Sequence, residues 1–359
     1  MTPPPVLGPS GRPDGAPPLA GQTGGGVTPS PDIGPKGRPV DAASGGKSGD
    51  GVMTTHVSGE LQAVTGGRVR FDEPMRAHTS FHIGGPAEVW VEPQTLDELK
   101  ELVALAHALE MPITPIGSGA NLLVRDSGIP GMVISLSAPA FGRVDLEGAR
   151  VTIGAGVGLD RVVALTRDAG LGGCEFLTGI PGKVGGAVRM NAGTRDGHDG
   201  FRAMSDVVTG VTVLEDDGRV VELSAEDVGF RYRSSSLNGN LVLGATMRLE
   251  PRPPEEITTK VADLMAYKRA TQDLSAPSAG CIFKNPGGGR PAAGRLIELA
   301  GLKGMRVGDA LVSGRHANFV VNLGTAKASD VLALISAIQY RILQEHGVFL
   351  ELEVQVMPA

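Results

Sequence analysis

Two glycine-rich segments carry the clearest chemical signal in this 359-residue chain. Residues 177–193 (LTGIPGKVGGAVRMNAG) hold five glycines and a proline among small apolar residues. Residues 115–124 (PIGSGANLLV) follow an apolar run typical of a strand and end in another such run. Because glycine lets backbone N–H groups approach a ligand closely, the two segments favour loops around one pyrophosphate-bearing cofactor. A tight-turned core segment without a ligand would also explain either loop taken alone.

Other cofactor and metal signals are weak. The dinucleotide fingerprint G-x-G-x-x-G occurs nowhere in the chain, which disfavours an ordinary Rossmann site. The seven histidines show no paired metal-ligand spacing with carboxylates or cysteines, so we predict no metal centre. The two cysteines, Cys174 and Cys281, are too few for a disulfide scaffold and are typical of a reducing compartment. We therefore expect a cytoplasmic protein, with Cys174 as a small core residue.

Composition separates a tail from a globular part. Residues 1–52 contain 11 prolines and 13 glycines and no aromatic residue, so we expect this segment to be disordered. The whole chain is 41% hydrophobic and carries a net charge of −6, which argues against nucleic acid as the main partner. Its apolar stretches are far shorter than the roughly 20 residues that cross a bilayer, so no membrane partner is expected.

Alternating strand and helix patterns indicate an α+β fold after the tail. Thr95 and Glu98 form a capping box at the start of a helix over 95–111. The pair Asp217-Gly218 lies between two apolar runs and predicts a β-hairpin.

The end of the chain follows a proline-rich boundary at 251–254 (PRPP). The pattern predicts a long helix over 330–346, capped by Ser329 and ended by Gly347, and then a strand over 349–356.

Eight segments of this chain resemble those of the UDP-N-acetylenolpyruvoylglucosamine reductase family, in the family's order and from about residue 71 to 356. The segments are HTSFHIGGPAEVWV, PIGSGANLLV, GIPGKVGGAVRMNAG, FRYRSSSL, SAGCIFKNP, AGRLIELAGLKG, VSGRHANFVVN and LELEV. The resemblance implies a vanillyl-alcohol-oxidase-type (PCMH-type) FAD-binding fold in two subdomains, followed by a C-terminal α+β substrate-binding domain. The expected boundaries are a tail over 1–52, FAD-binding subdomains over 53–124 and 125–252, and a substrate-binding domain over 253–359.

The resemblance also implies an activity. In that family NADPH reduces FAD and leaves, and the enolpyruvyl substrate then takes the hydride to become UDP-N-acetylmuramate, a peptidoglycan precursor. We therefore expect an FAD- and NADPH-dependent oxidoreductase with small-molecule partners, acting as a monomer. Two other functions stay open: another FAD-dependent oxidoreductase of the same fold acting on an alcohol or sugar, or a non-enzymatic nucleotide-binding protein.

The family motifs imply a set of FAD-binding residues in the two glycine loops. In the first loop they are Gly117, Ser118, Gly119, Ala120 and Asn121, and in the central loop they are Gly179, Ile180, Pro181, Gly182, Gly185, Gly186, Ala187 and Asn191.

Three residues take the family's catalytic positions. Hydride addition beside a carboxylate builds up negative charge, and Arg233 is implied as the cation that stabilises it, with Arg231 as the main alternative. Cys281 stands where the family commonly has the serine that donates a proton; a thiol with a pKa of about 8.5 keeps its proton at neutral pH and gives it up more readily than a hydroxyl. Glu353 matches the catalytic glutamate, and Glu351 is expected on a solvated face.

Two further residues are implied as substrate ligands. Arg269 would bind the diphosphate of the uridine nucleotide, and Asn285 a polar edge of the substrate. The chain departs from the family pattern nearby, because Asp273 stands where a proline is usual.

Overall fold

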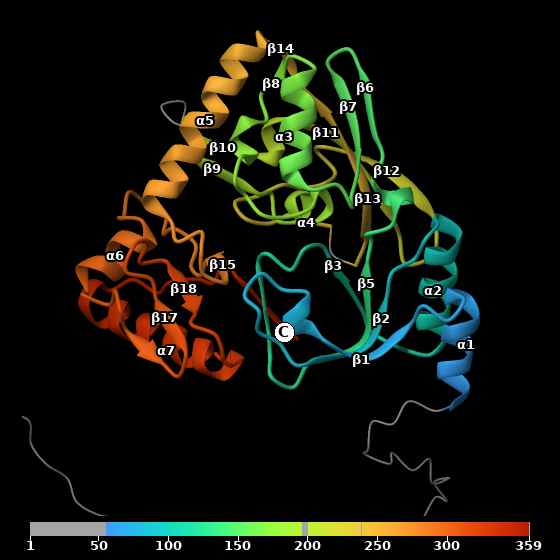
Figure 1. Ribbon diagram of the computed structural model, residues 1–359, viewed down its shortest axis with the longest axis horizontal. Coiled ribbons are helices and arrows are strands. Elements are labelled where there is room, and N and C mark those ends of the chain that lie inside the picture. Colours follow the sequence, from blue (N-terminus) through green and yellow to red (C-terminus); the bar gives the residue numbers. More distant parts are fainter. Residues whose placement is uncertain (1–54, 196–199, 238, 359) are drawn as a thin grey trace, which may run out of the picture. The chain divides into compact units, whose positions relative to one another are not determined.

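The computed structural model describes residues 55–195, 200–237 and 239–358. The tail predicted over 1–52 lies outside these residues. The described chain mixes helices with three main sheets, so the predicted α+β class is correct (Figure 1). No helix in this described part combines the length and apolar character needed to span a bilayer.

The first sheet has four strands in the order β1-β2-β5-β3, with β2, β5 and β3 parallel and β1 antiparallel to β2. These strands are β1 (Arg70–Pro74), β2 (Pro86–Val91), β3 (Ile113–Ile116) and β5 (Ile129–Ser135), and the helices beside them are α1 (Thr55–Thr65) and α2 (Leu96–Ala108). Side chains of β2 alternate between faces. Val89 and Val91 join one core with the buried leucines of α2, and Trp90 joins a second core on the opposite face.

The predicted capping of α2 is confirmed. Thr95 Oγ1 accepts a hydrogen bond of 3.1 Å from Glu98 N, and the Glu98 carboxylate accepts one of 3.0 Å from Gln94 N. The helix ends at Ala108, three residues before the predicted end.

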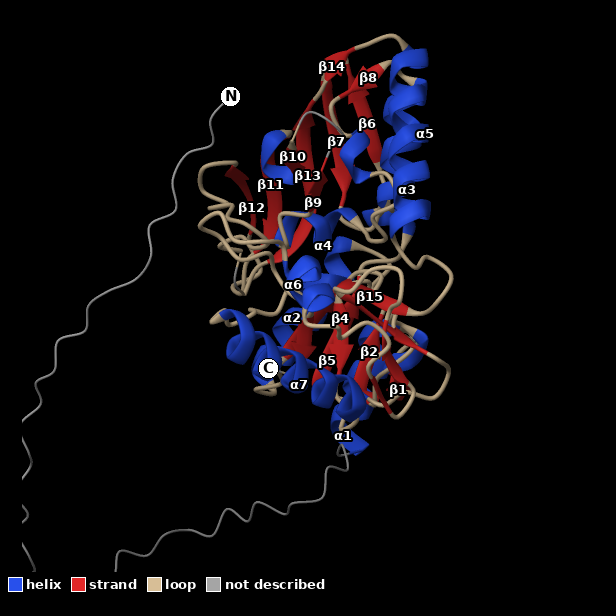
Figure 2. Cartoon of the chain, turned by 90° about the vertical axis from the view of Figure 1, so that its left-hand side faces the viewer, coloured by secondary structure: helices blue, strands red, loops and turns tan. Residues whose placement is uncertain are grey.

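The second sheet is antiparallel, in the order β12-β11-β13-β7-β6. Its strands are β6 (Val144–Glu147), β7 (Arg150–Gly154), β11 (Val208–Leu214), β12 (Val220–Ser224) and β13 (Leu241–Arg248). The hairpin predicted at Asp217-Gly218 joins β11 to β12 and is confirmed. Helix α3 (Leu159–Asp168) packs its apolar side chains into the core of this sheet, and α5 (Pro254–Thr271) lies beside α3 (Figure 2).

Short elements lie between these strands and helices along the chain. They are η1 (Met75–Ala77), β4 (Leu122–Val124), η2 (Pro139–Phe141), β8 (Leu171–Gly172), η3 (Glu175–Leu177), α4 (Val184–Arg189), β9 (Gly193–Arg195), β10 (Phe201–Ala203), η4 (Met204–Asp206) and β14 (Glu250–Pro251).

The third sheet is antiparallel, in the order β15-β18-β17-β16. Its elements are β15 (Ser278–Cys281), α6 (Ala293–Leu299), β16 (Arg306–Val307), β17 (Ala310–Val312), β18 (Phe319–Asn322) and α7 (Ala328–His346). Phe81, which precedes β2, and Leu123 of β4 also pack into the core of this region.

The strand predicted over 349–356 is wrong in extent. Only β19 (Gln355–Met357) is a strand, and it pairs in parallel with β4. The preceding residues pair instead with the chain after β15, where Glu353 N donates to Ile282 O at 2.8 Å and Lys284 N donates to Glu351 O at 2.8 Å. Because the segment changes partners midway, it does not form one continuous strand.

The predicted cap of the long helix is also wrong. Helix α7 begins at Ala328, so Ser329 lies inside it. The carboxylate of Asp126 accepts hydrogen bonds from Ala328 N at 2.8 Å and Ser329 N at 3.0 Å. A distant aspartate therefore caps this helix, whereas its predicted end at Gly347, in the left-handed conformation, is confirmed.

We expect Asp126→Ala to lower the free energy of unfolding by about 0.5–2 kcal/mol at neutral pH, the usual range for a lost N-terminal cap. Burial alone raises the pKa of Asp126, but the hydrogen bonds from Ala328 and Ser329 outweigh it and hold the pKa below its ordinary value. The stabilisation is therefore present at neutral pH and is lost as pH falls through the folded-state pKa. Urea unfolding at several pH values measures this. Equal stability of the two proteins at pH 7 would contradict the assignment, and Asp126→Asn, which keeps one acceptor, should be affected less.

Candidate active site

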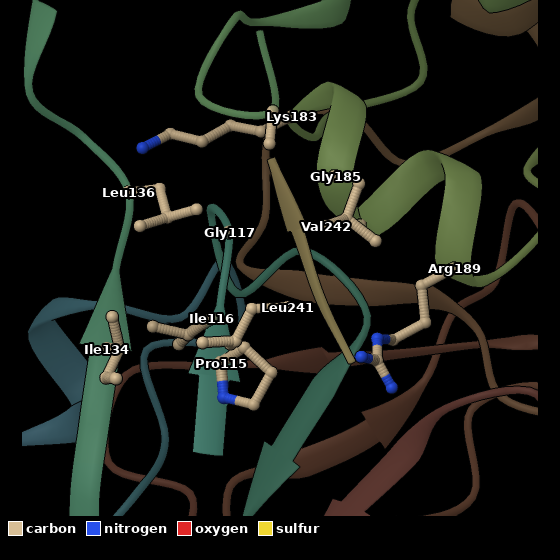
Figure 3. Close-up of a pocket in the computed structure, with 12 residues that line it drawn as sticks. Pro115, Ile116, Gly117, Ile134, Leu136, Lys183, Gly185, Arg189, Leu241 and Val242 are labelled. Atoms are coloured by element: carbon tan, nitrogen blue, oxygen red, sulfur yellow. The ribbon is translucent and has the colours of Figure 1, made fainter. Parts of the chain in front are cut away.

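Both glycine loops reach one hollow between the first and second sheets. The hollow is lined by Pro115, Ile116, Gly117, Ile134, Leu136, Ala155, Lys183, Gly185, Gly186, Arg189, Leu241 and Val242 (Figure 3). Its walls therefore come from the end of β3, from β5, from α4 with the residue before it, and from the start of β13. The sequence predicted that the two loops serve one ligand, and the fold does bring them together.

At two positions in the hollow, neither packing within the protein nor the backbone conformation requires glycine. At Gly186, within α4, a Cβ atom would meet no other atom within 4 Å, and at Gly117 the nearest would be Lys183 Cβ at 3.7 Å. Neither residue has a positive φ. Glycine inside a helix costs about 1 kcal/mol relative to alanine, so close approach of a ligand is a physical reason for it. This surface fits a large cofactor that lies against backbone.

Other predicted cofactor ligands have structural roles of their own. At Gly119 φ is +62°, and a Cβ there would lie 2.1 Å from His78 O. Gly182 has a φ of +153°. Asn121 Nδ2 donates to Glu353 O at 3.0 Å, so the first loop is bonded to the C-terminal segment. Of the thirteen predicted FAD contacts, the hollow itself is lined by Gly117, Gly185 and Gly186.

Sequence analysis missed two cations that line the hollow. Lys183 Nζ donates to Ser137 Oγ at 2.8 Å, and Arg189 Nη2 donates to Asn240 O at 2.5 Å. Burial lowers the pKa of both side chains, against a smaller opposing effect of Glu92 on Lys183. Both lie inside the central glycine motif, so their position in that motif was a usable signal. Figure 3 shows the Arg189 side chain extending from the end of α4.

Arg233 lies in a tight turn with a strained backbone. Arg231 N donates to Ser234 O at 2.9 Å, and Ser234 N donates to Arg231 O at 3.2 Å, which closes the turn. The φ of Arg233 is +58°, a conformation that costs a non-glycine residue on the order of 1–3 kcal/mol. Asn191 holds the turn, because its Nδ2 donates to Arg231 O at 3.0 Å while its Oδ1 accepts from Ser205 N at 2.9 Å.

The Arg233 side chain forms an ion pair with Glu353. Its Nε lies 2.8 Å from Glu353 Oε1, and both side chains are 15% exposed. Its Nη1 donates to Gly193 O at 2.6 Å, and the rings of Phe201 and Tyr232 each lie 5.4 Å from its guanidinium carbon. Burial raises the pKa of Glu353, although the charge of Arg233 opposes the shift. Two of the three predicted catalytic residues are therefore in direct contact.

Cys281, at the end of β15, lies beside this pair. Glu353 N and Val354 N both donate to the carbonyl of Ile282, the residue that follows Cys281. Burial, and then the negative charge of Glu353, raise the pKa of the Cys281 thiol to about 12, while Arg233 acts in the opposite direction. The thiol therefore keeps its proton across the physiological range.

The two predicted substrate ligands lie outside this cluster's contacts. Asn285 is exposed and its Oδ1 accepts from Ala293 N at 3.0 Å, which caps α6. Arg269 is exposed on α5 and its carbonyl accepts from Arg315 Nη1 at 3.1 Å. Glu351 is 72% exposed and pairs with Lys284 at 3.5 Å, in agreement with its predicted solvated position.

Cys174 lies in the core, as expected. Cys174 is buried, with its Sγ 3.1 Å from Thr166 Oγ1, and burial raises the pKa of its thiol to about 12. Among the residues with described positions, no group of three His, Cys, Asp or Glu side chains could hold a metal ion.

Two family models match separate parts of this chain. Residues 87–224 match the model of an FAD binding domain, and residues 272–357 match the model of the UDP-N-acetylenolpyruvoylglucosamine reductase C-terminal domain. The predicted arrangement, an FAD-binding part followed by a C-terminal α+β part, is confirmed.

Full-length relatives agree with these matches. The chain is 43% identical over 310 residues to UDP-N-acetylenolpyruvoylglucosamine reductase of Geobacter metallireducens, which covers 85% of this chain and 99% of the relative. It is 43% identical over 292 residues to UDP-N-acetylenolpyruvoylglucosamine reductase 2 of Symbiobacterium thermophilum, covering 81% and 92%. The crystal structure of the Thermus caldophilus reductase superposes with a TM-score of 0.69 at 42% identity, covering 81% of this chain and 99% of that one. The chain therefore belongs to the UDP-N-acetylenolpyruvoylglucosamine reductase family, whose members are FAD-dependent oxidoreductases.

Proposed function

We propose that this protein reduces the enolpyruvyl group of UDP-N-acetylglucosamine enolpyruvate to the lactyl group of UDP-N-acetylmuramate, with NADPH as the reductant and FAD as the hydride carrier. One observation carries the proposal. Arg233, Cys281 and Glu353, far apart in the sequence, form one cluster that is bonded to the first glycine loop through Asn121.

The cofactor would lie against the two glycine loops, 117–121 and 179–187, with the cations of Lys183 and Arg189 at the hollow's wall. FAD bound there would supply hydride transfer from NADPH to the methylene carbon of the enolpyruvyl group. Gly117 and Gly186 leave the room that close contact requires.

Arg233 stabilises the charge that follows hydride addition. The substrate carboxylate gains enediolate character as its neighbouring carbon becomes electron-rich, and a fixed cation in a water-poor site stabilises such charge strongly. Glu353 and the carbonyl of Gly193 hold the guanidinium through its Nε and Nη1. The cation is therefore oriented before the substrate arrives.

Cys281 donates the proton that completes the reaction. The electron-rich carbon forms a C–H bond with the proton of Sγ, and the thiolate then regains a proton from water. Burial, and then the charge of Glu353, disfavour the thiolate, so the proton stays on Sγ until a stronger base is formed beside it.

Product analysis tests the proposal. Purified holoenzyme with NADPH and the enolpyruvyl substrate should yield a product heavier by two hydrogen atoms, with one NADPH oxidised for each product molecule, measured by mass spectrometry and absorbance. An unchanged substrate while NADPH is consumed by oxygen would reject this function and favour another flavin oxidoreductase.

A further inference from the structure

Lys268 is a buried cation that this mechanism has not used. It lies in the last turn of α5, on the same helix face as the buried Ile257 and Leu264, and its residue surface is 4% exposed. Its Nζ donates to Thr178 O at 2.5 Å. In the described part of the chain no carboxylate forms an ion pair with it. A buried ammonium without a counter-ion is costly, so stability is a poor reason for this residue.

Lys268 connects the central glycine loop to the catalytic cluster. Thr178 immediately precedes Gly179, and a Cβ atom at Gly179 would lie 3.0 Å from Lys268 Cδ. On the other side, the charge of Arg233 acts on the ammonium, and the charge of Lys268 opposes the rise in the pKa of Cys281. The lysine therefore contacts the central loop and lies within electrostatic reach of the cluster.

The charge balance of the cluster depends on this lysine. Arg233 and Glu353 form an ion pair in which the two charges offset each other, and the Cys281 thiol is neutral. With the ammonium of Lys268 added, the group of Arg233, Glu353, Cys281 and Lys268 carries one net positive charge. An ammonium has three N–H donors, and one of them is directed at Thr178 O, so two can serve a ligand.

We propose that Lys268 supplies the net positive charge that binds the substrate's enolpyruvyl carboxylate beside Arg233. This inference rests on the proposed function, because it names the charged group of that substrate as the ligand. Since hydride addition increases the negative charge on the same carboxylate, the ammonium also favours the transition state over the bound substrate.

The test compares the substrate with its carboxylate methyl ester, which lacks the charge. We expect wild-type holoenzyme to bind the acid more tightly than the ester at pH 7, by titration calorimetry without NADPH. Lys268→Met should remove about 10- to 100-fold of that preference, the usual range for a hydrogen bond between charged groups. Lys268→Arg, which keeps the charge, should retain most of it. Lys100→Met, which removes a lysine charge from α2, should leave the preference unchanged.

A purely structural lysine gives a different result. If it only anchors Thr178, Lys268→Met weakens binding of acid and ester equally, and an unchanged acid preference in that variant would overturn the inference while leaving the proposed function intact. Wild-type protein that binds neither compound would remove the proposed function, and the inference with it.

A pH series in the wild type covers the case in which Lys268→Met does not fold. Burial, and then the charge of Arg233, lower the pKa of Lys268 to about 8, so its charge is present below that pH and is lost above it. The acid preference should fall as pH rises through about 8. Arg233, Cys281 and Glu353 are the other groups of the cluster, and the charge of Lys284 also acts on Glu353. The effects of all four groups persist in Lys268→Arg. A preference that does not fall in the wild type, or falls equally in Lys268→Arg, would overturn the inference.

Discussion

Replacing Cys281 by alanine should leave flavin reduction by NADPH near normal and slow reoxidation by the enolpyruvyl substrate by about 10²–10⁴-fold. The two half-reactions differ because only the second needs a proton on a substrate carbon. Burial, and then the charge of Glu353, raise the pKa of this thiol to about 12. The thiol is therefore protonated at neutral pH and can act as a proton donor, and not as a thiolate nucleophile. Stopped-flow absorbance of the flavin measures each half-reaction separately.

The chain offers a matched control for this variant. Cys174 is also a buried thiol whose pKa is raised to about 12, but it lies in the core of the second sheet. Cys174→Ala should change stability and leave both half-reactions within a few-fold of wild type, whereas Cys281→Ser should restore much of the lost rate. Substrate-driven reoxidation that stays within a few-fold of wild type in Cys281→Ala would refute the proton-donor role.

Gly186→Val should yield folded protein without flavin. A Cβ at this position meets no protein atom within 4 Å, so the branched side chain enters the hollow and not the core. Gly186 has no positive φ, unlike Gly182 at +153°, where any side chain would strain the backbone. The Gly186 variant thus separates cofactor exclusion from misfolding. The measurement is the ratio of flavin absorbance to protein absorbance after purification, together with the circular dichroism spectrum.

Gly59 is the control for this glycine. It lies in α1, where a Cβ also meets nothing within 4 Å, so Gly59→Val makes the same change in a helix far from the glycine loops in sequence. We expect it to retain full flavin occupancy. Full occupancy in Gly186→Val as well would contradict the placement of the cofactor in this hollow.

Local signals in the sequence predicted local structure well. Thr95 and Glu98 are three residues apart, and the capping bond between them forms as predicted. The Asp217-Gly218 turn likewise needs only its neighbours. The cap of α7 could not be found in this way, because Asp126 is 202 residues away from the N–H group that it accepts from. Tertiary contact, and not propensity, determines where that helix begins.

The candidate active site, like the cap of α7, depends on contacts between residues that are far apart in the sequence. The motifs predicted Arg233, Cys281 and Glu353, and the fold adds that Arg233 and Glu353 are ion-paired, so their charges offset each other. The family motif indicated Arg269, which is exposed, whereas its neighbour Lys268 is buried. A helical signal existed, since Lys268 follows Leu264 by four residues on the apolar face. The hydrogen bond from Lys268 Nζ to Thr178 O joins residues that are 90 positions apart, so the sequence alone could not predict it.

The absorbance of the bound flavin in one anaerobic sample tests the central claim most directly. We expect NADPH to bleach the flavin, and UDP-N-acetylglucosamine enolpyruvate, added next without oxygen, to restore its colour as UDP-N-acetylmuramate appears. A flavin that stays reduced after that addition and regains its colour only in air would contradict the account.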